Sequence, residues 1–119
     1  MSELVTPWAG RWGWVYRSGF DRKDIGEVSG WSREGGVGLP PEFVAFGDTT
    51  GLWARINLEI GSLIDIFEDD EITDQESLLV SAQIIDDATA NTEHGSVGSA
   101  LAGFLRYASL EGFSVEFWL

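Results

Sequence analysis

The chain has 119 residues, of which 44% are hydrophobic, so it has the size and the apolar content of one domain with a single core. It contains no cysteine, which excludes a disulfide scaffold, a thiolate metal site and a cysteine nucleophile. Its net charge of −13 opposes direct binding to nucleic acid or to an anionic lipid surface, because both are themselves negative.

Residues 11–20 (RWGWVYRSGF) alternate aromatic residues with others, which predicts a β-strand with its large rings on one face. A second short strand is predicted over residues 26–31. Residues 34–41 (EGGVGLPP) are predicted to be a loop that no strand or helix crosses, because glycine leaves the backbone unrestrained and proline removes hydrogen-bond donors.

Residues 42–46 form a compact apolar stretch, and residues 47–51 (GDTTG) then predict a hairpin loop that leads into a long strand over residues 52–60. Apolar residues occupy every second position of that strand, whereas Trp53 falls on the opposite, polar face. We therefore predict a β-hairpin in which the Trp53 side chain is exposed.

Gly61 predicts a bulge before a further short strand over residues 63–67. A Thr-Asp-Gln-Glu sequence from Thr73 is typical of a capping box and predicts a helix from residue 74 to about residue 88. Alternating apolar residues within the same segment also fit a strand, so both interpretations stay open over residues 77–86. Helical spacing of apolar residues predicts another helix over residues 96–110, with Gly112 at its C-cap.

Residues 113–119 alternate apolar and polar side chains, which predicts a terminal strand that closes or edges the sheet. The sequence thus predicts an α+β fold: an antiparallel β-sheet, made by a β-rich N-terminal half and the C-terminal strand, with one or two helices packed on one face. We expect residues 1–119 to form a single domain, in which a near-neutral, Trp-rich β segment (1–55) precedes a strongly acidic β/α segment (56–119).

The negative charge belongs almost entirely to the second half of the chain. Residues 1–55 hold six Lys and Arg against seven acids, whereas residues 56–119 hold only Arg106 against thirteen acids. A soluble domain of this size needs a net charge of only about 2 to 8, and closely spaced carboxylates repel one another. A solvated face that aids solubility is one interpretation, and a surface selected for its electrostatic field is the other.

The densest acidic run, residues 67–76 (FEDDEITDQE), has three interpretations as a site. No frame in it supplies the alternate oxygen ligands, central glycine and final glutamate of an EF-hand, so no metal site is predicted. Acid–base catalysis needs carboxylates in contrasting environments, and no His, Lys or Tyr stands within this run. The third interpretation is a recognition surface whose carboxylates imitate the phosphates of a nucleic-acid backbone.

The predicted partner-binding surface follows the acidic half and includes two tryptophans on polar strand faces, where large rings would anchor an interface. Its residues are Glu59, Asp65, Glu68, Asp69, Asp70, Glu71, Asp74, Glu76, Asp86, Asp87, Glu93, Trp53 and Trp118. His94, the only histidine, is predicted to be an exposed loop residue rather than a ligand or a base. No catalytic residue, metal or cofactor is predicted.

In size, charge and absence of catalytic motifs, the chain resembles phage-encoded anti-defence proteins, such as anti-CRISPR or anti-restriction DNA mimics, and immunity proteins that neutralise toxic nucleases. The resemblance is one of general character over the whole chain and assigns no residue. It implies a non-enzymatic inhibitor that binds the basic nucleic-acid-binding surface of a nuclease or of a CRISPR-type or restriction complex. We expect such a protein in the bacterial host cytoplasm, with neither nucleic acid nor membrane as a direct partner, and a homodimer stays open.

The six tryptophans support an alternative from another class. Exposed tryptophan rings could line a groove for a small ligand or a carbohydrate on the β-rich half, although such rings also fill the core of a thin sheet. Salt separates the two hypotheses, because charge-driven binding to a basic protein weakens as ionic strength rises, whereas binding in an aromatic groove hardly responds.

Overall fold

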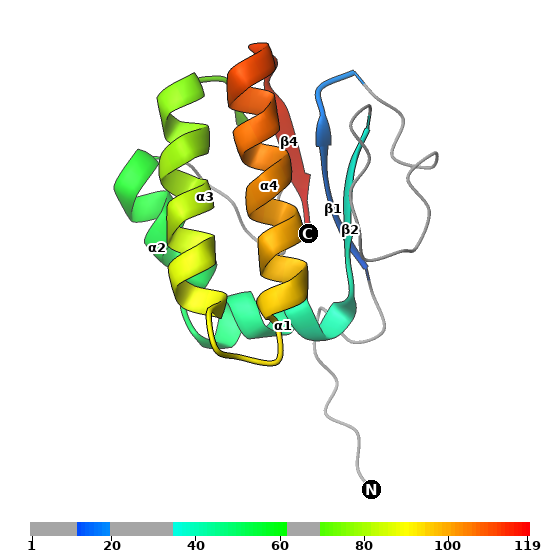
Figure 1. The fold of residues 1–119 in the computed structure, drawn as a ribbon, viewed down its shortest axis with the longest axis vertical. Coiled ribbons are helices and arrows are strands. Elements are labelled where there is room, and N and C mark those ends of the chain that lie inside the picture. Colours follow the sequence, from blue (N-terminus) through cyan, green and yellow to red (C-terminus); the bar gives the residue numbers. More distant parts are fainter. Residues whose placement is uncertain (1–11, 20–34, 62–69) are drawn as a thin grey trace, which may run out of the picture.

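The structure, a computed structural model, describes residues 12–19, 35–61 and 70–119. The strands and helices of these residues follow one another as β1 (Gly13–Arg17), β2 (Gly36–Leu39), α1 (Pro41–Thr49), α2 (Leu52–Ile60), β3 (Asp70–Ile72), α3 (Gln75–Thr89), α4 (Gly95–Glu111) and β4 (Val115–Trp118). The strands form one antiparallel sheet in the order β2-β1-β4-β3 (Figure 1). The predicted α+β fold is confirmed, and the described residues contain four helices rather than one or two.

β1 and β4 form the centre of the sheet and supply its buried face. They pair so that Val15 lies opposite Phe117, and both side chains are buried in the core. The strands predicted over residues 11–20 and 113–119 are therefore confirmed in their inner parts. β4 is not an edge strand, however, because β3 pairs with its other side and takes the edge position.

α3 and α4 pack side by side along their length, and their buried residues share one core with the strands (Figure 1). The cap of α3 is Asp74 rather than the predicted Thr73: the Asp74 carboxylate accepts a hydrogen bond from the Ser77 backbone N–H at 2.9 Å. α4 ends at Glu111 and is capped by Gly112, whose φ of 81° places it in the left-handed region that favours glycine. Both predicted helices are confirmed, and the strand alternative over residues 77–86 is wrong.

The β-hairpin predicted over residues 42–60 is also wrong, because this segment forms α1 and α2. In α2 the buried residues are Leu52, Trp53 and Ile56, which follow helical spacing, whereas Leu58 is 83% exposed. The alternation of apolar residues is therefore present in the sequence without being reflected in burial. Gly51 and Gly61 flank α2 with positive φ values of 78° and 73°.

Trp53 is buried rather than exposed, with a relative exposure of 3%. Its indole N–H donates a hydrogen bond to the Val44 carbonyl of α1 at 3.2 Å. Gly47 leaves the room for the ring, since a Cβ at that position would lie 2.6 Å from the Trp53 Cζ2 atom. Trp53 thus holds α1 against α2 and is not part of an exposed surface.

The loop predicted over residues 34–41 contains β2 and the start of α1, so that prediction is wrong. β2 lies too close to β1 for a side chain at Gly36, where a Cβ would be 2.6 Å from the Tyr16 Cα. Pro41 occupies the start of α1, where the missing backbone N–H removes no helical hydrogen bond. Glycine and proline disfavour the interior of a strand or helix, but Gly36 stands where β2 approaches β1 closely and Pro41 stands at the first position of α1.

The strands predicted over residues 26–31 and 63–67 lie outside the described residues. Within the described ranges, no helix combines the length and the apolar character that a membrane crossing would require.

Candidate functional site

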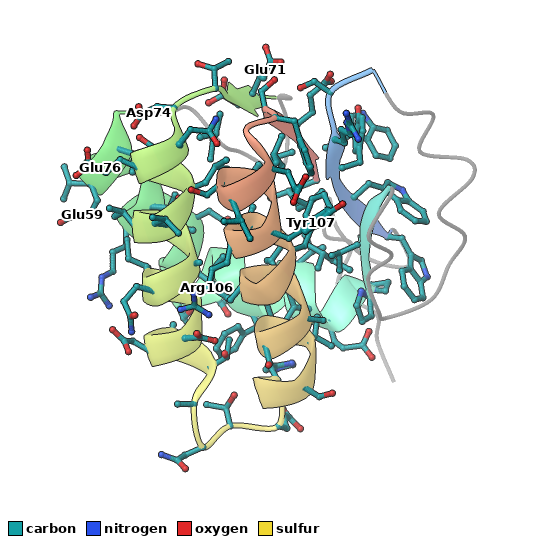
Figure 2. The ribbon with its side chains drawn as sticks, turned by 45° about the horizontal axis from the view of Figure 1, so that its top comes forward. Glu59, Glu71, Asp74, Glu76, Arg106 and Tyr107 are labelled. Atoms are coloured by element: carbon teal, nitrogen blue, oxygen red, sulfur yellow. The ribbon has the colours of Figure 1, made fainter. Side chains whose placement is uncertain are left out.

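Six carboxylates gather where α2 and α4 end, where α3 begins, and along β3. The Ser109 hydroxyl of α4 donates a hydrogen bond to the Gln75 carbonyl of α3 at 3.0 Å, and Ile60 of α2 lines the same hollow as Ser77 of α3. These contacts bring three helix ends to one end of the molecule, which Figure 2 shows with four of the carboxylates labelled. We call this region the acidic end; its carboxylates are Glu59, Asp70, Glu71, Asp74, Glu76 and Glu111.

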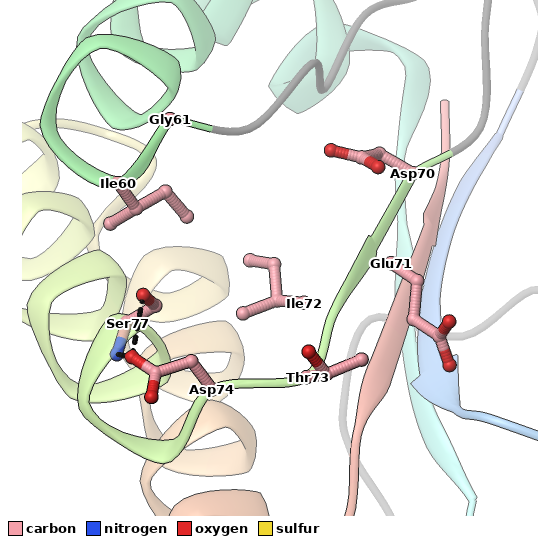
Figure 3. A pocket seen from close by; sticks show the side chains of 8 residues that line it. All are labelled: Ile60, Gly61, Asp70, Glu71, Ile72, Thr73, Asp74 and Ser77. Carbon is pink, nitrogen blue, oxygen red and sulfur yellow. Dashed lines mark hydrogen bonds between the residues drawn. The ribbon is translucent and has the colours of Figure 1, made fainter.

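A hollow of about 240 Å³ opens at the acidic end between α2, β3 and α3. Asp70, Ile72 and Ile60 face it, whereas Glu71 points to the other side of β3 (Figure 3). This difference follows from the alternation of side chains along a strand. Of the six carboxylate residues, Asp70, Glu71 and Asp74 line this hollow, and their side chains are not directed to a single point.

Among these carboxylates, Glu71 and Asp74 accept hydrogen bonds from serine residues of the fold. The Glu71 carboxylate accepts hydrogen bonds from the Ser18 hydroxyl at 2.6 Å and from the Ser114 hydroxyl at 3.2 Å. Asp74 accepts from both the backbone N–H and the hydroxyl of Ser77, each at 2.9 Å. Glu71 and Asp74 consequently stabilise the sheet edge and the start of α3.

Glu59, Glu76 and Glu111 are exposed and have no hydrogen bond or ion pair in the described part of the chain. Of the described arginines, Arg17 comes near this end, since its neighbour Ser18 donates to Glu71, and its guanidinium lies 4.6 Å from the centre of the Phe113 ring. Arg55 of α2 stands four residues before Glu59, on the same face of that helix. Among the described residues, two arginines against six carboxylates leave the acidic end negative. The three unpaired glutamates are the groups that an external cation could reach without breaking a contact.

The predicted surface is not continuous, because three of its acids lie at the opposite end of α3. α3 has 15 residues and is therefore about 22 Å long. Asp86 stands in its last turn and pairs with Arg106 of α4 at 2.7 Å, and the neighbouring Asp87 accepts from the Gln83 amide at 3.0 Å. Glu93 follows in the loop before α4. The structure thus separates the predicted acids into two groups.

Every described helix carries a carboxylate in its last turn, and none of the four has a basic residue there. The residues are Asp48 in α1, Glu59 in α2, Asp86 and Asp87 in α3, and Glu111 in α4. The carbonyl end of a helix carries a partial negative charge, so an acid at this position is destabilising by about 0.3 to 1 kcal/mol. Among these residues, Asp86 alone is neutralised by a neighbouring arginine. This placement does not serve the stability of the helices.

All three large apolar side chains that are exposed in the described residues lie at the acidic end. Leu58 and Leu110 are each 83% exposed and stand directly before Glu59 and Glu111, and Leu79 is 47% exposed in the second turn of α3. Leu58 and Leu110 could not be recognised as exposed from the sequence, because each one occupies an apolar position of a predicted element. Their exposure is visible only once the packing of α2 and α4 is known.

Asp65, Glu68 and Asp69 lie outside the described residues. Trp118 is half-buried on the sheet face opposite the core residue Phe117, directly across from Trp14 of β1. Of the two predicted tryptophan anchors, Trp53 is excluded by its burial, and Trp118 keeps partial exposure.

The sequence predicted that His94 is an exposed loop residue. This prediction is wrong, because the His94 side chain is only 13% exposed. Its ring lies against Phe46 with a centroid distance of 4.4 Å and meets the edge of Phe43 at 5.9 Å. The burial arises from the contact between α1 and the loop that precedes α4, two segments that are far apart in the sequence.

Across the ranges 12–19, 35–61 and 70–119, no three His, Asp or Glu side chains are grouped so that they could hold a metal ion. Comparison with protein-family models, with curated proteins and with solved structures gives no match for this chain.

Proposed function

We propose that this chain is a non-enzymatic inhibitor whose acidic end binds the basic nucleic-acid-binding surface of a nuclease, or of a CRISPR-type or restriction complex. By occupying that surface, the protein keeps nucleic acid out. The partner is a protein rather than nucleic acid or a membrane, because the carboxylates of the acidic end repel both polyanions.

The observation that carries this proposal is the coincidence of unpaired carboxylates and exposed leucines at the acidic end. A face that serves solubility alone needs only carboxylates solvated by water and salt ions, and it needs no exposed apolar side chains. Leu58, Leu79 and Leu110 beside Glu59, Glu76 and Glu111 form a mixed surface, in which apolar groups can be buried while the glutamates meet Arg and Lys. Such a surface suits a folded basic partner.

The acids in the last turns of the helices support the same conclusion. A chain selected only for solubility could hold its negative charge at helix N-termini, where the helix dipole stabilises carboxylates. Here Glu59 and Glu111 stand at carbonyl ends, where carboxylate and backbone carbonyls together attract a cation. We infer that the helices tolerate this cost because the charge acts on a partner.

Two biological settings fit this proposal: a phage-encoded anti-defence protein, such as an anti-CRISPR, and an immunity protein that neutralises a toxic nuclease. Both place the protein in the bacterial cytoplasm together with its target. The neighbouring genes distinguish them, since an adjacent toxin gene implies immunity and an adjacent helix-turn-helix regulator in a phage operon implies anti-defence.

The test is inhibition of nucleic-acid cleavage by the nuclease that this neighbourhood identifies. We expect Glu76→Lys to weaken inhibition by about tenfold or more, because it reverses an exposed charge at the acidic end. The matched control is Asp87→Lys, which makes the same charge change on the same helix at the other end and should cost less than about threefold. Leu79→Ser should weaken binding without changing its dependence on salt.

The proposal fails if the two reversals weaken inhibition equally, since the effect would then belong to the net charge. It also fails if the affinity for the nuclease does not fall as salt is added.

A second candidate function, binding of a small ligand or carbohydrate, is favoured by the tryptophans on the sheet face away from the core. Trp12 stacks on Trp14 with a centroid distance of 6.2 Å and an interplanar angle of 26°, and Trp14 lies opposite Trp118 in the sheet. Such a ligand would quench tryptophan fluorescence, and the quenching would change little between low and high salt.

A further inference from the structure

A second and larger hollow, of about 680 Å³, lies at the other end of the molecule between α1 and the start of α4. Its volume falls within the range of ligand pockets in proteins, about 300 to 1,000 Å³. Side chains of both segments line it, namely Glu42, Phe46 and Thr49 of α1 together with Glu93, His94 and Val97. None of the carboxylates of the acidic end lines this hollow.

The wall of this hollow is aromatic and fixed in place. The His94 ring lies 4.4 Å from the Phe46 ring, with an angle of 42° between the two planes. Phe43 is fully buried behind them, 6.0 Å from Phe46 and 5.9 Å from His94. Its ring in turn meets the buried Trp53 ring edge-on at 6.1 Å. Because these ring-to-ring contacts continue into the core, Phe46 and His94 are held in their positions before any ligand binds.

The rim of the hollow is negative. Glu42 is exposed at the start of α1 and has no hydrogen bond or ion pair with any described residue. The Glu93 side chain is 86% exposed, and its one contact in the described residues is with the His94 Nε2, at 3.6 Å. Among the described residues that line the hollow, none is a lysine or an arginine that could neutralise these two carboxylates. The lining thus combines two tilted aromatic rings with two acceptors of charged hydrogen bonds.

We propose that this hollow is a binding site for a guanidinium group, supplied by an arginine side chain of a protein partner. A guanidinium is planar, so it can stack on the Phe46 ring, and its N–H groups can donate to the carboxylates at the rim. An ammonium group lacks the planar face and is more strongly hydrated, so the hollow should prefer arginine to lysine.

This inference rests on the proposed function in one respect, that the partner is a basic protein. The site itself is separate from the acidic end, because the two regions lie at opposite ends of α3, which is about 22 Å long. A partner that meets both would be held at two points, and the arginine site would orient it on the surface that the acidic end attracts.

The experiment is a titration of the full chain with Nα-acetyl-arginine amide, followed in two-dimensional NMR spectra of the backbone amides, with Nα-acetyl-lysine amide as the matched probe. We expect saturable shifts at residues 42–49 and 93–97, and an affinity for the arginine probe at least about threefold higher than for the lysine probe. The double substitution Glu42→Gln with Glu93→Gln should weaken arginine binding by about fivefold or more. Phe46→Leu keeps an apolar side chain of similar size and should remove the preference for arginine over lysine.

Glu59→Gln with Glu76→Gln is the control, because it removes the same charge at the acidic end and should leave the shifts at the hollow unchanged. The site is refuted if both double variants weaken binding equally, if the shifts spread over all acidic residues without saturating, or if lysine binds as well as arginine. The failure of the inhibitor proposal would look different: nuclease inhibition would be insensitive to Glu76→Lys while the arginine titration still saturates at the hollow.

Discussion

At the N-terminal end of α3, Asp74 and Glu76 lie where the helix dipole and the free backbone N–H groups favour a carboxylate. At the C-terminal end of the same helix, Asp86 and Asp87 lie where the dipole opposes them, and no basic residue stands in that turn of the helix. The first end is held by hydrogen bonds to a carboxylate. The second end must be held by something else.

Close packing holds the second end. Thr89, the last residue of α3, is buried, and its hydroxyl donates a hydrogen bond to the Ile85 carbonyl at 2.8 Å. Gly98 of α4 lies directly against it, so close that a Cβ on Gly98 would come within 2.7 Å of the Thr89 Cβ. Of the acids at the carbonyl ends, Asp86 contributes a contact between helices through its ion pair with Arg106, whereas Asp48, Glu59 and Glu111 have no ion pair in the described residues. Most of this charge is therefore separable from the stability of the fold.

The largest effect should follow from disturbing this packed end. Gly98→Ala places a methyl group into the Thr89 side chain, and we expect the free energy of unfolding to fall by about 1 to 3 kcal/mol. Urea denaturation followed by tryptophan fluorescence measures it. Gly95→Ala in the same helix is the control, because its Cβ would meet only the Thr89 carbonyl at 3.4 Å. Equal losses in the two variants would show that the Thr89 contact does not hold this end.

A substitution at the start of α3, which Asp74 caps, should lower the free energy of unfolding by less than Gly98→Ala does. Asp74→Ala removes the acceptor for the Ser77 backbone N–H, and we expect a loss of about 1 kcal/mol in the free energy of unfolding, measured by the same urea denaturation. Asp74→Asn keeps a side-chain oxygen that can accept this hydrogen bond, so it should remain close to the unaltered protein. If the asparagine variant loses as much as the alanine variant, the contribution of Asp74 is its charge and not its cap.

The parts of the fold that the sequence predicted correctly are those in which pattern and burial agree. In α4 the apolar spacing matches the buried Leu101, Phe104, Leu105 and Ala108, and in β4 the alternation matches the buried Val115 and Phe117. α2 was mispredicted because Leu52, Ile56 and Ile60 fit both a two-residue and a four-residue repeat. The burial of Trp53 decides for the helix, and that burial depends on Val44 and Gly47 of α1.

The acidic character of the second half was evident in the sequence, and its division between two ends was not. Glu111 joins Glu59 and Glu76 only because α4 ends beside the start of α3, which the contact from Ser109 to Gln75 establishes. The hollow around His94 was missed for the same reason, since its walls come from α1 and from the loop after α3. One signal was available: an acid near the end of each predicted helix, with no base beside it, is unusual.

The smallest and sharpest test uses one neutral substitution at each end of α3. Glu76→Gln and Asp87→Asn each remove one exposed negative charge, so both relieve the general repulsion of a chain with net charge −13 to a similar extent. The helix dipole acts on them with opposite sign, and we expect Asp87→Asn to exceed Glu76→Gln in the free energy of unfolding by about 0.5 to 1 kcal/mol at low salt. High salt should reduce the difference, because the dipole effect is screened. A difference of zero, or of the opposite sign, would mean that an acid at a carbonyl end costs a helix of this protein nothing, and the positions of Glu59 and Glu111 would then no longer support a role for their charge in partner binding.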